Sequence, residues 1–177
     1  MDAYEGGLLG NLQPVLCVAD RSCKALDRAA AGGLEIVLLD RKQYGEKLSE
    51  ALGILLIDYG IELVALAGWL SIISGMLTRE WAGRMVNIHP SLLPSYGGKG
   101  MYGQHVHKAV LDAGEKLSGC TVHLVTDSVD GGGILGQARV NVLKNDTPES
   151  LAARILIEEH GLYSKVLDHL GAAILNE

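Results

Sequence analysis

The chain has 177 residues, 48% hydrophobic and 20% charged, which suits a single α/β domain over residues 1–177. A formal net charge of −6 without a long basic run excludes a broad nucleic-acid-binding face. The three cysteines form no CxxC pair, which argues against a disulfide framework or a zinc knuckle and favours a reducing cytoplasm, and no apolar run is long enough to span a membrane.

The first half of the chain alternates short apolar runs with helical patterns, which is typical of a parallel α/β sheet. The glycines of Gly32-Gly33 and Gly60 mark the ends of two helices. The expected strands are residues 14–19, 34–39, 63–67 and 85–88. The expected helices are residues 22–31 and 44–59.

The second half begins with a helix expected at residues 106–113 and then changes in texture. Two alternating runs, residues 119–126 and 134–142, bracket an Asp-Gly-Gly-Gly turn, so they are expected to pair as a hairpin or as neighbours in the sheet. A closing helix is expected to be capped by Thr147, with Pro148 in its first position, and to run to about Leu170.

The start of the chain departs from the usual pattern of a doubly wound sheet, which opens with a strand and a glycine-rich turn into a helix. Here the first clear strand comes only after Gln13. Gly6-Gly7 and Gly10-Asn11 have a glycine-rich composition, but no strand precedes them. We therefore interpret this segment as the tail of a helix followed by a turn, because a glycine motif binds phosphate only in its structural context.

The segment Asn87-Ile88-His89-Pro90-Ser91-Leu92-Leu93-Pro94 follows a buried strand, where open α/β sheets place their ligands. Residues two apart on an extended chain point to the same side, so Asn87 and His89 can face one pocket. The amide suits stabilisation of a carbonyl oxygen that gains negative charge. The imidazole suits proton transfer near neutral pH.

Asp130 opens the glycine-rich turn, and a carboxylate near His89 would favour the imidazolium and fix the orientation of the ring. The three following glycines permit close backbone approach. Spacing alone leaves a second interpretation open, namely a satisfied buried histidine and an ordinary turn-forming aspartate.

Four segments in order resemble the glycinamide ribonucleotide transformylase family over nearly the whole chain. They are NIHPSLLP, SGCTVHLVTDSVDGG, ILGQARVNV and DTPESLAARILIEEH. The resemblance implies a doubly wound, mostly parallel sheet of the formyltransferase fold. It also implies transfer of a formyl group from 10-formyltetrahydrofolate to 5-phosphoribosylglycinamide in purine synthesis, without a metal. Asn87 would hold the formyl oxygen, His89 would donate the proton to the tetrahedral intermediate, and Asp130 would favour the protonated form of His89.

The resemblance also implies binding residues. The pterin slot of the family corresponds to residues 68–74, although the family often has Arg or Lys where Ser71 stands. The residues implied to contact the folate are Arg41, Leu70, Ser71, Ile72, Ile73 and Asn87. The residues implied to contact the other substrate are Pro90, Ser91 and Glu159, of which Glu159 would bind the ribose hydroxyls. His105 and His107 are expected at the rim of the site, and His123 is expected to be a packed, hydrogen-bonded histidine.

One part of the family pattern is missing from this sequence: a first strand, a Gly-Ser-Asn phosphate loop and most of a first helix. We therefore expect unpaired strand edges or a gap in the sheet, and a truncated gene model or fragment. Another folate-dependent formyltransferase, a deformylase and an inactive folate-binding remnant stay open as alternatives. A deformylase typically has a second histidine where Pro90 stands. Assembly into a homo-oligomer is also left open.

Overall fold

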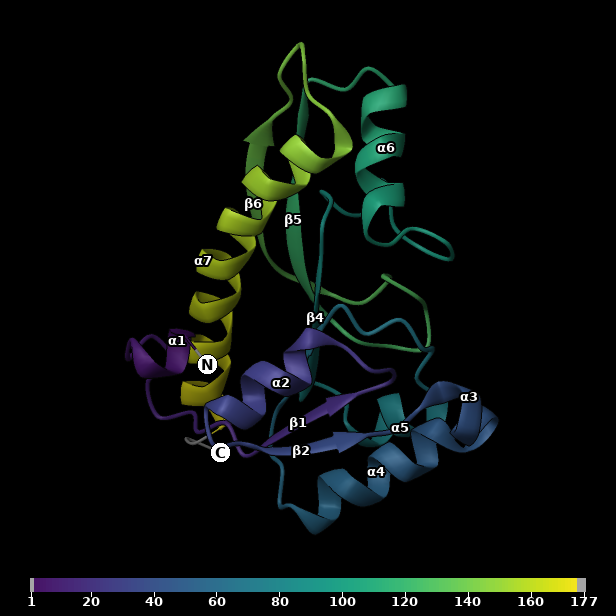
Figure 1. Cartoon of the computed structure of the whole chain (residues 1–177), viewed down its shortest axis with the longest axis vertical. Helices are drawn as coiled ribbons and strands as arrows, with labels where there is room; N and C mark the ends of the chain where they lie inside the picture. Colours follow the sequence, from purple (N-terminus) through teal and green to yellow (C-terminus); the bar gives the residue numbers. More distant parts are fainter. Residues whose placement is uncertain (1, 175–177) are drawn as a thin grey trace.

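The computed structural model describes residues 2–174, which fold into an α/β structure with two separate sheets (Figure 1). In the smaller sheet, β1 (Leu16–Ala19) and β2 (Glu35–Leu38) are parallel. The larger sheet has the order β3-β4-β5-β6. Its strands are β3 (Val64–Ala67), β4 (Met85–His89), β5 (Leu117–Leu124) and β6 (Ile134–Asn141). Because β3 and β4 are parallel while β5 runs antiparallel to both β4 and β6, this sheet is mixed.

The helices cover both sheets. α2 contacts β1 and β2, whereas the long α7 lies along β5 and β6 and extends from there to the end of the molecule that holds β1 and β2 (Figure 1). The shorter helices are α1 (Asp2–Glu5), α2 (Lys24–Ala31), α3 (Arg41–Tyr44), α4 (Leu48–Asp58), α5 (Gly75–Glu80) and α6 (Gln104–Asp112). A 3₁₀ turn, η1 (Gly45–Lys47), joins α3 to α4, and α7 spans Pro148–Ile174.

The strands lie where the apolar runs predict them, but the expected helix at residues 44–59 is divided. Gly45 takes a positive φ of 52°, which ends α3 before η1 and α4 begin. Asp40 caps α3 by accepting a hydrogen bond from the Lys42 N–H at 2.9 Å. The short α5 was not predicted. The interpretation of the first residues is confirmed, since α1 is followed by a turn through Asn11.

The closing helix begins as its sequence predicts. The Thr147 hydroxyl accepts from the Ser150 N–H at 3.2 Å, and the Ser150 hydroxyl accepts from the Thr147 N–H at 3.0 Å. This reciprocal pair satisfies backbone donors that the first turn of a helix leaves without partners. Further along α7, the buried Tyr163 hydroxyl lies 2.9 Å from the Leu66 carbonyl and 3.2 Å from the Val86 carbonyl, so it joins the helix to β3 and β4.

Two apolar clusters of buried side chains form the core of the described residues. One cluster lies between α4, α5 and the sheet, with Leu52, Leu77 and Met85 almost fully buried. The other lies under α7, where Leu151 and Ile155 contact buried side chains of α6, β5 and β6. Burial of these apolar surfaces is the main source of stability for such a fold. Although α7 is long, no helix within residues 2–174 combines the length and apolarity needed to cross a bilayer.

A gap separates the two sheets, as the missing first strand implied. Among the described residues, β1 and β3 each have a strand partner on one side only. A hollow of about 500 Å³ lies between them, and its walls include Leu16 and Val18 of β1 and Val64 and Leu66 of β3. Edge strands that face each other in this way keep backbone donors and acceptors without sheet partners.

Candidate active site

A cavity of about 1050 Å³ lies beyond the carboxyl ends of β3 and β4, where open α/β sheets bind ligands. Four stretches of loop and strand end form most of its wall: residues 66–73, 87–90, 98–104 and 125–130. Glu149, Leu156 and Glu159 of α7 close one side. A hollow of this size matches a ligand pocket for a molecule larger than a single metabolite ring.

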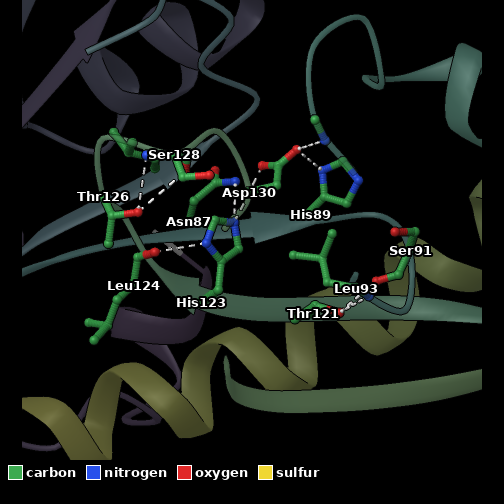
Figure 2. Close-up of polar contacts among 12 residues, drawn as sticks. Asn87, His89, Ser91, Leu93, Thr121, His123, Leu124, Thr126, Ser128 and Asp130 are labelled. Carbon is green, nitrogen blue, oxygen red and sulfur yellow. Dashed lines mark hydrogen bonds and ion pairs between the residues drawn. The ribbon is translucent and has the colours of Figure 1, made fainter. Parts of the chain in front are cut away.

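The structure brings together the three residues that the sequence singled out for chemistry (Figure 2). His89 ends β4 and is 4% exposed. Its Nδ1 lies 3.6 Å from an Asp130 carboxylate oxygen, and its Nε2 lies 2.8 Å from the Tyr96 carbonyl oxygen. A proton on either ring nitrogen therefore faces an oxygen acceptor. The two side chains are therefore neighbours, although His89 is also a buried histidine with a hydrogen-bond partner and Asp130 also lies in a turn.

Asp130 is held by several groups at once. It takes a positive φ of 54° in the turn between β5 and β6, and one carboxylate oxygen accepts from the Gly98 N–H at 2.8 Å. The other oxygen lies 3.5 Å from His123 Nε2. Burial alone raises the pKa of Asp130, but the His123 contact, the Gly98 N–H and the neighbouring His89 outweigh it, so the pKa lies below its ordinary value.

His123 belongs to the site, which the sequence did not predict, although the expectation of a packed, hydrogen-bonded histidine is confirmed. It is directly opposite Asn87 in the antiparallel register of β4 and β5. Its Nδ1 lies 2.9 Å from the Leu124 carbonyl oxygen, and its Nε2 lies 3.1 Å from Asn87 Nδ2. Because a carbonyl only accepts, Nδ1 carries a hydrogen, while Nε2 faces both the Asn87 amide and the Asp130 carboxylate.

This hydrogen bond fixes the Asn87 side chain and leaves part of it free for a ligand. One amide N–H points to His123, and none of the hydrogen bonds among residues 2–174 takes the second N–H. Asn87 also lines the cavity. An amide donor held in this way has no need to reorganise when a carbonyl oxygen in the cavity gains negative charge.

Of the residues implied to contact the folate, all but Arg41 line the cavity. Leu70, Ser71, Ile72 and Ile73 form part of its wall, and Ile72 is 70% exposed while Ile73 is buried. The Ser71 N–H and hydroxyl, however, both donate to Asp20, at 3.0 Å and 2.7 Å. Arg41 lies outside the wall, with its guanidinium 4.0 Å from the same carboxylate.

The residues expected for the second substrate are divided between the wall and the interior. Pro90 and Glu159 line the cavity, and burial raises the pKa of Glu159. The structure does not bring Ser91 to the cavity: its side chain is fully buried, and its hydroxyl donates to the Ser95 carbonyl at 2.7 Å. Ser91 therefore stabilises the loop that carries Pro90.

The two histidines expected at the rim also differ. His107 lines the cavity and is 5% exposed, and burial together with the neighbouring His89 lowers its pKa. His105 lies outside the wall, where its ring meets the edge of Tyr102 with 5.2 Å between centroids. Within residues 2–174, no group of three or more His, Cys, Asp or Glu side chains is placed to hold a metal ion.

Comparisons with known proteins find relatives of this chain in sequence and in structure. The chain is 41% identical over 168 residues to "Phosphoribosylglycinamide formyltransferase, chloroplastic" of Arabidopsis thaliana. The aligned region covers 92% of the chain and 56% of that protein. It superposes with a TM-score of 0.86 on glycinamide ribonucleotide transformylase 1 of Symbiobacterium toebii, at 36% identity over 94% of the chain and 77% of that structure. The phosphoribosylglycinamide formyltransferase structure of Brucella melitensis gives a TM-score of 0.80 at 41% identity, over 89% of the chain and 80% of that structure.

The chain spans about half the length of the curated plant relatives that it matches, 56% and 54%. The match to the formyl transferase family model covers residues 8–167, which include both sheets and every residue of the cavity wall. The chain therefore belongs to the formyl transferase family.

Proposed function

We propose that this protein transfers a formyl group from 10-formyltetrahydrofolate to the amine of 5-phosphoribosylglycinamide, a step of one-carbon metabolism in purine synthesis. The observation that carries the proposal is the 3.6 Å approach of His89 to Asp130 beside an amide with a free N–H, all at one cavity. The names of the relatives supply the formyl group and the amine that accepts it, and the family resemblance supplies the folate donor.

The cavity wall fits a folate as the donor substrate. Leu70, Ile72 and Ile73 offer an apolar surface for a planar ring, and the backbone of Leu70 and Ile72 offers donors and acceptors for its polar edge. The folate supplies the activated formyl group. Pro90 and Glu159 line the same cavity and would contact the phosphorylated amine, with the Glu159 carboxylate suited to sugar hydroxyls.

Three side chains would share the chemistry. When the amine nitrogen forms its bond to the formyl carbon, the carbonyl oxygen gains negative charge, and the second N–H of Asn87 stabilises it. The bond to the folate nitrogen then breaks, and His89 passes a proton to that leaving nitrogen. Asp130 is ionised near neutral pH because its pKa is lowered, so it balances the positive charge on His89. The proton lost by the attacking amine restores His89.

Replacing His89 tests the proposal. In His89→Ala, the rate of formyl transfer is expected to fall by a factor of about 10² to 10⁴, the usual contribution of a positioned acid or base. Transfer is measured from the absorbance change of the folate as it loses its formyl group. The matched control is His160→Ala, because His160 is an exposed histidine of α7 outside the cavity wall. Turnover of His89→Ala equal to that of the control would overturn the assigned role.

The same assay separates the alternatives. Release of free formate without a formylated amine would identify a deformylase. A folded chain that binds a folate analogue in calorimetry but transfers nothing would be the non-catalytic remnant. Pro90 at the position where deformylases typically carry a second histidine supports transfer over hydrolysis.

The cellular setting is part of the proposal. Cys17, Cys23 and Cys120 are all free thiols, which supports a reducing compartment such as the cytoplasm. Cys120 is fully buried, and burial raises the pKa of its thiol to about 12, so it is chemically inert in the folded protein.

A further inference from the structure

Asp20 is a buried carboxylate that the proposed chemistry does not use. It follows β1 directly and is 1% exposed. One of its oxygens accepts from both the N–H and the hydroxyl of Ser71, at 3.0 Å and 2.7 Å. The other oxygen lies 2.5 Å from an Arg21 guanidinium nitrogen, and Arg41 lies 4.0 Å away. A buried charge is tolerated only with such partners.

These contacts cross the gap between the two sheets. Asp20 extends from β1, while Ser71 lies in the loop after β3, and no backbone ladder joins these strands among the described residues. Arg21 makes a second link, because its other guanidinium nitrogen donates to the Gly68 carbonyl at 3.1 Å. The loop 68–71 is thus held at both ends by the two consecutive residues that follow β1.

The loop that is held in this way forms the apolar wall of the cavity. Because the Ser71 N–H and hydroxyl both point to Asp20, the neighbouring Leu70 and Ile72 are left to present their side chains to the cavity. Ile72 is 70% exposed and lines the cavity, so a ligand bound there would cover it. Ile73 is buried in the core and anchors the other side of the loop.

We propose that Asp20 is a positioning residue for the folate: through Ser71 and Arg21 it holds the loop 68–73 in the shape that receives the planar ring. This inference rests on the proposed function, since it assigns the wall to the donor substrate. A loop that is already ordered loses less conformational entropy when the ligand binds. Asp20 therefore acts on folate affinity and leaves the amine site and the chemical step nearly unchanged.

The electrostatics of the cluster fit this role. Burial alone raises the pKa of Asp20, but the Ser71 hydrogen bonds and the charges of Arg21 and Arg41 outweigh it and lower the pKa. The carboxylate is therefore charged throughout the neutral range, and the cluster works independently of pH there.

Three variants, measured in the full chain, test the proposal. Asp20→Ala is expected to raise the Kd of a folate analogue that cannot transfer a formyl group at least 10-fold in calorimetry. Ser71→Ala is expected to raise this Kd about 2- to 5-fold, the usual effect of losing one hydrogen bond. The effect is smaller because the backbone N–H of residue 71 still reaches Asp20. Asp20→Asn keeps an acceptor and is expected to lie between the two. In both Asp20 variants, the Kd of 5-phosphoribosylglycinamide and kcat at saturating folate are expected to change less than 2-fold.

Asp146 offers a matched control, because its replacement removes a buried carboxylate and lowers stability without touching the cavity. Like Asp20, it is a buried carboxylate that binds a serine hydroxyl and an arginine, namely Ser150 and Arg154, but it lies at the start of α7 outside the cavity wall. Asp146→Ala is expected to lower the Tm as Asp20→Ala does and to leave folate affinity unchanged. Equal folate affinity in wild type, Asp20→Asn and Ser71→Ala would overturn the proposal, even if Asp20→Ala fails to fold.

Hydrogen exchange separates this proposal from the function on which it rests. Amides of residues 68–73 are expected to exchange at least 10-fold faster in Asp20→Asn than in wild type without any ligand. If the wild type binds no folate analogue but this acceleration is seen, the proposed function fails while the positioning of the loop stands. Unchanged exchange in both Asp20→Asn and Ser71→Ala would overturn the positioning itself.

Discussion

The carboxylate of Asp130 receives the Gly98 N–H and faces two histidines, so one side chain links three segments of the site. Asp130→Asn removes its charge and keeps its size, and the free energy of unfolding is expected to fall by about 1–3 kcal/mol, the cost of weakening buried hydrogen bonds to a charged group. Because the folded-state pKa lies below the ordinary 3.8, this contribution is present above that value and is lost as the pH falls through the folded-state pKa. Urea unfolding of both proteins is expected to show a difference that shrinks as the pH falls below about 4. A difference that stays constant down to about pH 3 would contradict this assignment.

The individual residues of the site were predictable to different degrees. Asn87 and His89 could be predicted to share a pocket, because alternation along a strand fixes which side chains share a face. The approach of Asp130 could not be derived from spacing, because it depends on how a loop returns to the sheet. His123 was missed because its contact with Asn87 requires the register of β4 and β5. Asp20 was missed because a single aspartate after a strand reads as a turn residue.

At the scale of elements, the turn between β5 and β6 depends on close backbone contact. A Cβ added at Gly132 would lie 1.8 Å from the Leu124 carbonyl oxygen, whereas one at Gly133 would meet only the end of the Leu124 side chain at 3.8 Å. Gly132→Ala is therefore expected to lower the free energy of unfolding by about 1–3 kcal/mol and to reduce formyl transfer by displacing Asp130. Gly133→Ala is the matched control, expected within about 0.5 kcal/mol of wild type in urea unfolding. Equal stability of the two variants would show that the turn tolerates a side chain at both positions.

Element types followed from the sequence more reliably than element boundaries. The first four strands were found from short apolar runs between turn residues, and the last two from alternating runs around a glycine-rich turn. The division between α3 and α4 was missed because it depends on the positive φ of Gly45, and a glycine can also lie within a helix. The α5 helix was missed because its single turn is too short to show a helical period, although the Ser74 hydroxyl caps it.

At the scale of the whole molecule, the two sheets are expected to differ in stability because no strand joins them. β5 lies inside the four-stranded sheet and most of its residues are buried, whereas three of the four residues of β2 are exposed. The Asp20 contacts and the neighbouring helices connect β1 and β2 to the rest, so this pair has fewer buried contacts to lose. In native-state hydrogen exchange, the amides of β1 and β2 are expected to exchange at least 10-fold faster than those of β5. This factor corresponds to an opening free energy lower by about 1.4 kcal/mol. Low concentrations of urea are expected to speed exchange in β1 and β2 first, since a unit that unfolds separately responds before the global transition. Equal protection and an equal urea response in both sheets would instead mean that the cavity-lining loop and α7 make the molecule one cooperative unit despite the gap.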